Sequence, residues 1–89
     1  MAFKQENIER IISLARAYGV TRLILFGSAI ESPAEARDID IACDGIVGWK
    51  LYELSARLEE ELDMPLDVIP LSPQTRFTKH IEKKGRVLI

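Results

Sequence analysis

The sequence has few of the residues that mark secreted, zinc-binding or membrane proteins. It contains one cysteine, Cys43, and one histidine, His80, which rules out an internal disulfide and a zinc site of the Cys/His type. No apolar run approaches the roughly 20 residues that a membrane span needs. No signal peptide is recognisable either. We therefore expect a cytoplasmic protein without membrane contact, in which Cys43 is a small buried residue.

Charge and length restrict the possibilities further. The formal net charge is −2, and the lysines and arginines are dispersed along the chain. A protein that grips the nucleic acid backbone needs a basic patch or stripe, so direct nucleic acid binding is disfavoured. With 89 residues, the chain has room for one modest core. We expect a single domain over residues 1–89.

The apolar pattern predicts alternating helices and strands. Helical spacing from Ile8 to Ala15 predicts a first helix that ends at Gly19, and leucines from Leu51 to Leu62 predict another that ends near Asp63. Short apolar runs predict strands over 22–26, 38–43 and 66–69. This order predicts an α+β (α/β two-layer) fold, in which helices cover a small mixed sheet.

The end of the chain predicts one more helix. Ser72-Pro73 looks like an N-cap followed by a first-turn proline, which opens a helix that runs to Lys84 and stops at Gly85. Residues 87–89 are apolar and form either a short edge strand or a tail that docks on a partner.

Two of the predicted strands contain three carboxylates. Asp38 and Asp40 are two residues apart in one strand and share a face, while Asp67 lies within the later apolar run. Neighbouring carboxylates repel and raise each other's pKa unless a cation relieves the repulsion. Mg²⁺ prefers such hard oxygen ligands and completes its shell with water and substrate phosphates. The three side chains are our candidate metal ligands.

Gly27-Ser28 directly follows the strand over 22–26. Glycine lets the backbone approach a ligand closely, and the Ser28 hydroxyl and nearby N–H groups can bind a phosphate. Taken singly, Gly-Ser is also an ordinary turn, and Asp-x-Asp is also common on the wet face of a sheet. Their order and strand context favour the functional interpretation.

Phe26-Gly27-Ser28, Asp38-Ile39-Asp40 and Asp67 resemble the minimal nucleotidyltransferase (MNT) domains of the DNA polymerase β-like superfamily. The resemblance covers nearly the whole chain and implies the polymerase β-like nucleotidyltransferase fold. It implies that Asp38, Asp40 and Asp67 are catalytic and hold magnesium, with two ions expected. It also implies that Gly27 and Ser28 hold a nucleoside triphosphate, with ATP as the expected substrate.

Standalone MNT domains of this size resemble the antitoxin half of HEPN/MNT pairs. This implies that AMP is transferred to a tyrosine hydroxyl of a HEPN ribonuclease toxin, which silences it. The alternative is a catalytically degenerate module that binds nucleotide or a HEPN protein without transferring anything. Transfer to a small molecule is a third possibility, disfavoured because no second substrate-binding domain is evident.

The chain departs from the family pattern in the loop over 29–37, which is one residue shorter than usual and has Arg37 before the first Asp. Arg37 either adds positive charge to the triphosphate site or pairs with Glu31 or Glu35 on the surface. Trp49 and Tyr52 either stack on the nucleotide base or pack in the core or at a partner interface.

Overall fold

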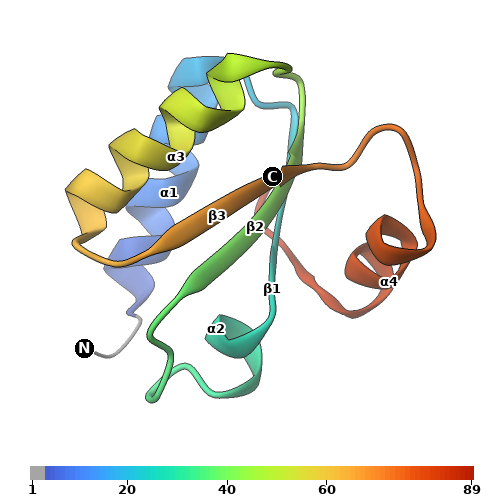
Figure 1. The fold of residues 1–89 in the computed structure, drawn as a ribbon. Helices are drawn as coiled ribbons and strands as arrows, with labels where there is room; N and C mark the ends of the chain where they lie inside the picture. The colour runs from blue at the N-terminus through green and yellow to red at the C-terminus, as the bar shows by residue number, and fades with distance from the viewer. Residues whose placement is uncertain (1–3) are drawn as a thin grey trace.

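A computed structural model describes residues 4–89 as two layers of helices on a central mixed sheet (Figure 1). The strands are β1 (Arg22–Phe26), β2 (Ile39–Asp44), β3 (Leu66–Pro70) and β4 (Arg86–Val87). The helices are α1 (Gln5–Tyr18), α2 (Ser28–Glu31), α3 (Trp49–Leu62) and α4 (Arg76–Lys84). The predicted α+β class, with helices covering a small mixed sheet, is confirmed.

The sheet has the order β3-β2-β1-β4. Strand β1 pairs antiparallel with both β2 and β4, whereas β2 and β3 run parallel. The parallel pair needs a crossover connection, which α3 provides. Strands β3 and β4 form the two edges, so the candidate Asp-x-Asp strand β2 lies inside the sheet.

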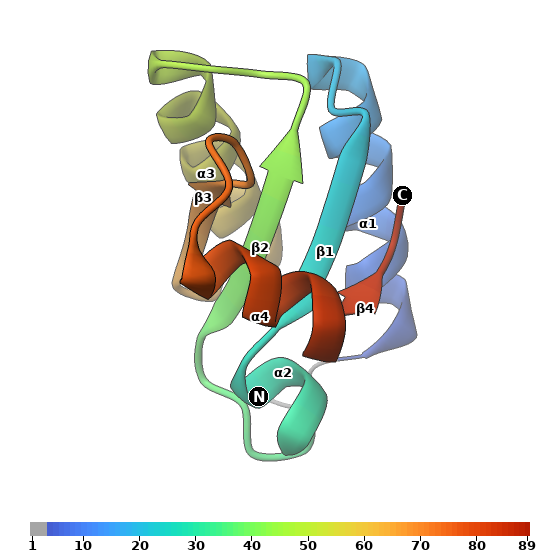
Figure 2. The same cartoon turned by 90° about the vertical axis from the view of Figure 1, so that its right-hand side faces the viewer.

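Helices α1 and α3 cover one face of the sheet, and α4 lies across the other, above α2 (Figure 2). The larger core forms under α1 and α3, where Ile11, Leu54 and Leu58 meet Ile39 and Ile41 of β2. The apolar stripes predicted from the sequence account for this packing. Gly19 and Asp63 end α1 and α3 in the left-handed conformation, as predicted (φ 98° and 53°).

Helix α4 begins later than predicted. Its N-cap is Thr75, whose Oγ1 accepts from the Thr78 N–H at 3.1 Å, while the Thr78 Oγ1 accepts from the Thr75 N–H at 2.8 Å. The prediction of an N-cap at Ser72 with Pro73 in the first turn is therefore wrong. Two reciprocal hydrogen bonds satisfy the first amides at Thr75, and the Ser72 hydroxyl instead donates to Asp44 Oδ1 at 2.9 Å.

The end of the chain forms an edge strand. Arg86 and Val87 pair with β1, and the Leu88 N–H donates to the Leu23 carbonyl at 2.8 Å. Leu88 and Ile89 are half-buried against the larger core, so Val87 alone of these three is strongly exposed. Within residues 4–89, no helix has the length and apolarity needed to cross a membrane.

Candidate active site

Two of the candidate carboxylates, Asp40 and Asp67, lie side by side at one end of the sheet, on the face that carries α4. Asp40 pairs in register with Phe26 of β1 on one side and with Asp67 of β3 on the other. Side chains of register partners point to the same face of a sheet. Phe26, Asp40 and Asp67 therefore form a row across three strands, at the end where β1 runs into α2.

The strand alternation explains why Asp40 is held firmly. Its neighbours Ile39 and Ile41 are fully buried in the core on the opposite face. Slipping the register by one residue would expose both isoleucines and bury the carboxylate, so the core fixes where the carboxylate points. Asp38 lies one residue before β2 as the structure has it, so the predicted strand over 38–43 is shifted to Ile39–Asp44.

The pKa of Asp40 is affected by the other two candidate carboxylates. Burial raises the pKa of Asp40 above its usual value, and the charges of Asp67 and Asp38 raise it further. Asp67 and Asp38 therefore both lie close enough to Asp40 for their charges to act on it. Asp67 and Asp38 are exposed, whereas Asp40 is half-buried. Ionisation of Asp40 is therefore less favourable than ionisation of a carboxylate in water.

Gly27 lies directly against Asp40. A Cβ built on Gly27 would come within 2.7 Å of Asp40 Oδ2, closer than Cβ atoms are found in proteins. The backbone of Gly27 has φ 77° and ψ −149°, a conformation essentially reserved for glycine. The backbone conformation therefore favours glycine at this position, and a larger residue would also displace the Asp40 carboxylate.

Ser28 begins α2, a single helical turn within the loop that the sequence places after Gly27. The Gly27 carbonyl accepts from the Ile30 N–H at 3.0 Å and closes this turn. Arg37 is exposed, and the ion pairs formed within residues 4–89 involve other side chains. The surface pair of Arg37 with Glu31 or Glu35 is therefore not formed.

The donor set fits a magnesium ion that is shared with a substrate. Within residues 4–89, no three Asp, Glu, His or Cys side chains are gathered tightly enough to hold a metal ion by themselves. Magnesium does not require such a cage, because it binds through one or two carboxylates and takes its other ligands from water and phosphate. Asp40, whose pKa is raised by neighbouring carboxylates, is the kind of group that a cation stabilises.

Two hollows adjoin this row of side chains. One of about 300 Å³ lies between α2 and α4 and includes Phe26, Gly27 and Phe77. Another of about 340 Å³ lies at the edge of β3 and includes Asp67 and Tyr52. Trp49 and Tyr52 are 78% and 79% exposed, so the core-packing alternative is wrong for both side chains. Phe77 is not among the predicted site residues, because its sequence position indicates only that it belongs to the last helix.

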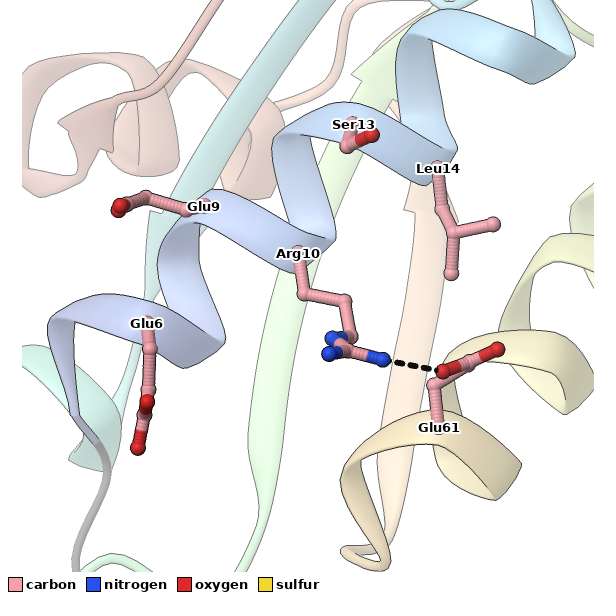
Figure 3. Close-up of a pocket in the computed structure, with 6 residues that line it drawn as sticks. All are labelled: Glu6, Glu9, Arg10, Ser13, Leu14 and Glu61. Carbon is pink, nitrogen blue, oxygen red and sulfur yellow. Dashed lines mark hydrogen bonds and ion pairs between the residues drawn. The ribbon is translucent and has the colours of Figure 1, made fainter.

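A third hollow, of about 480 Å³, lies away from the carboxylates, between α1 and the end of α3 (Figure 3). Arg10 crosses it to reach Glu61, with Nη1 2.6 Å from Oε2. Figure 3 shows Glu6 and Glu9 pointing away from this ion pair. The hollow contains none of the predicted site residues, and its ion pair joins the two helices.

No protein-family model and no curated protein sequence matches the chain. Solved structures do match. One is a toxin-antitoxin complex with AMP-PNP (27% identity, TM-score 0.78, 93% of this chain and 73% of that one). Another is the toxin-antitoxin complex MntA-HepT (26% identity, TM-score 0.75, 97% of this chain and 72% of that one).

A third match is a complex of a tri-AMPylated HEPN toxin from Shewanella oneidensis with an MNT antitoxin. It is 26% identical with a TM-score of 0.75, over 96% of this chain and 71% of the matched one. The resemblance drawn from Phe26-Gly27-Ser28, Asp38-Ile39-Asp40 and Asp67 is thus confirmed: the chain is MNT-like and has the minimal nucleotidyltransferase fold.

Proposed function

We propose that this protein is a magnesium-dependent nucleotidyltransferase that moves AMP from ATP to a tyrosine hydroxyl of a HEPN toxin, and that it acts as an antitoxin. The row formed by Asp40 and Asp67, with Asp38 beside it and the Gly27 backbone against Asp40, carries the proposal. The likeness to toxin-antitoxin structures, one with AMP-PNP and one with an AMPylated toxin, supports the nucleotide and the partner.

The proposed reaction is an in-line substitution at the α-phosphorus of ATP. The acceptor oxygen forms a bond to phosphorus, the bond to the pyrophosphate oxygen breaks, and pyrophosphate leaves. Magnesium, when bound, neutralises charge on the triphosphate and lowers the pKa of the attacking hydroxyl. Asp38, Asp40 and Asp67 are the residues proposed to hold it.

The remaining steps belong to residues of this chain. Asp67 is exposed at the start of the edge strand β3, where an acceptor hydroxyl can approach from solvent, and it accepts the hydroxyl proton. Gly27 and Ser28 bind the triphosphate at the end of β1. Arg37, free of the surface ion pairs considered for it, adds positive charge near the phosphates.

Incubation with a HEPN partner tests the proposal. The protein, ATP and magnesium are mixed with any HEPN protein that is encoded beside it, and the intact mass of the partner is measured. We expect a mass increase of one or more adenylyl groups, which chelator and the double substitution Asp38→Asn, Asp40→Asn both abolish. An unchanged mass increase in the double variant would overturn the assignment of the carboxylates.

One observation favours a second function, a nucleotide- or HEPN-binding module without transferase activity. Asp38 lies outside the strand that holds Asp40, so strand geometry does not fix one of the proposed metal ligands. This alternative predicts a stable complex with the HEPN protein and no mass increase. Failure to form any complex would exclude both functions in their antitoxin form.

A further inference from the structure

The hollow between α2 and α4 has a composition unlike that of a phosphate site. Its floor is Phe26, its α4 wall carries Phe77, His80 and Lys84, and its α2 wall carries Glu31. Phosphate groups offer only hydrogen-bond acceptors and negative charge; Lys84 attracts that charge and Glu31 repels it, and the apolar side chains of Phe26 and Phe77 offer a phosphate nothing. A heteroaromatic ring offers donors and acceptors on its edge and an apolar face, and both match this lining.

The hollow is continuous with the candidate active site. Gly27 lines it and also lies against Asp40, and Phe26 is the register partner of Asp40 in the row described above. A nucleotide with its phosphates at Asp40 and Ser28 can therefore extend into it. The cavity of about 300 Å³ is at the small end for ligand pockets, which suits one ring system and not a whole nucleotide.

Phe77 presents a ring that packing has already oriented. It lies edge to face against Phe26, with ring centroids 5.9 Å apart and planes at 84°. Even so, 56% of Phe77 is exposed, although Phe77 lies one helical turn before the buried Ile81 on the same side of α4. A ring held on one side and open on the other is suited to stacking a base at little entropic cost.

We infer that this hollow is the nucleobase site, with Phe77 as its stacking surface and Glu31, His80 and Lys84 at the polar edge of the base. The inference rests on the proposed nucleotidyltransferase function. The hollow beside Tyr52 is the alternative place for the base. Its lining contains no second aromatic ring, and it contains Asp67, which places it on the side where the acceptor hydroxyl is proposed to bind.

The test compares two ligands that share a triphosphate and differ in the nucleoside. Dissociation constants for ATP and for inorganic tripolyphosphate, each with magnesium, are measured by calorimetry on the full chain. The variant Phe77→Leu keeps an apolar side chain and removes the ring face, and Phe77→Tyr restores it. Trp49→Ala is the matched control, because it removes an exposed aromatic residue outside the hollow.

We expect Phe77→Leu to weaken ATP binding roughly tenfold, as loss of one stacked base does. Binding of tripolyphosphate should stay unchanged, Phe77→Tyr should restore ATP affinity, and Trp49→Ala should leave both constants unchanged. Equal weakening of both ligands by Phe77→Leu, or no weakening of either, overturns the inference. Selective loss of ATP affinity in Trp49→Ala also overturns it and moves the base to the start of α3.

The two proposals fail differently. If the natural chain binds ATP no more tightly than tripolyphosphate, the base site is wrong even if AMP transfer to the partner is found. If ATP binding depends on Phe77 but the partner gains no mass, the base site stands and the transfer function is wrong.

Discussion

Replacing Gly27 with Ala tests whether the backbone at the end of β1 is built around the Asp40 carboxylate. The substitution has two costs. The first is backbone strain, because φ 77° and ψ −149° are unfavourable for residues with a Cβ, by about 1–3 kcal/mol. The second is contact, because the new Cβ would lie 2.7 Å from Asp40 Oδ2. Relieving the contact requires Asp40 to leave its preferred rotamer, at about 0.5–1.5 kcal/mol.

Gly48 provides a matched control for the first cost. Its backbone has φ 64° and ψ −139°, close to that of Gly27, but no atom lies within 4 Å of a Cβ built there. Gly48→Ala therefore carries the strain without the contact. For a domain of this size, about 1 kcal/mol corresponds to about 4–8 °C. We expect the melting temperature of Gly27→Ala to be about 4–8 °C below that of Gly48→Ala.

The difference should vanish when the carboxylate is removed. In a protein that already carries Asp40→Ala, the clashing oxygen is gone. The decrease in melting temperature caused by Gly27→Ala should then equal the decrease caused by Gly48→Ala. Thermal melts of these variants are the primary assay. AMP transfer by Gly27→Ala should fall about 100-fold, because it displaces Asp40. Equal melting temperatures for Gly27→Ala and Gly48→Ala would refute the reasoning.

Two further predictions follow from the pKa shifts. Because burial and neighbouring carboxylates raise the pKa of Asp40, ionising it destabilises the folded state, and the free energy of unfolding should fall as pH rises from about 3.8 until Asp40 is fully charged. The double variant Asp38→Asn, Asp40→Asn should lose that fall and melt at the same or a higher temperature at pH 7; a clearly lower melting temperature would indicate a structural role. Burial, together with Asp44, raises the pKa of Cys43 to about 11, so a thiol reagent at pH 8 should label Cys43 only after unfolding, and rapid labelling of the folded protein would contradict this.

The sequence predicts features that depend on local spacing. Strand β1 has the predicted bounds, and the stripes of α1 and α3 face the core, because periodicity decides which side of an element is apolar. The alternation also predicts that Asp38 and Asp40 share a face, but Asp38 lies one residue before β2, so strand alternation fixes the face of Asp40 alone. The predicted start of α4 is wrong because Ser72 and Thr75 are both residues that cap helices, and the hydrogen bond from Ser72 to Asp44 leaves Thr75 as the N-cap.

Contacts between residues far apart in the sequence cannot be predicted from the local spacing of residues. Placing Asp67 opposite Asp40 requires the register between β2 and β3, which α3 sets by its length and packing. The sequence places Phe77 in the last predicted helix, but only the docking of α4 shows that Phe77 lies beside Phe26. The base site proposed here thus arises from how α4 crosses the sheet.

The division of the core between two faces explains how the fold tolerates its carboxylates. The larger cluster lies under α1 and α3 and includes Ile39 and Ile41, the residues on either side of Asp40. The opposite face has a smaller cluster in which Ile24, Ala42 and Ile81 anchor α4. The carboxylates occupy the part of this face that α4 leaves open. Stabilisation on one face of β2 therefore offsets charge repulsion on the other, and a bound cation would relieve that repulsion without rearranging the core.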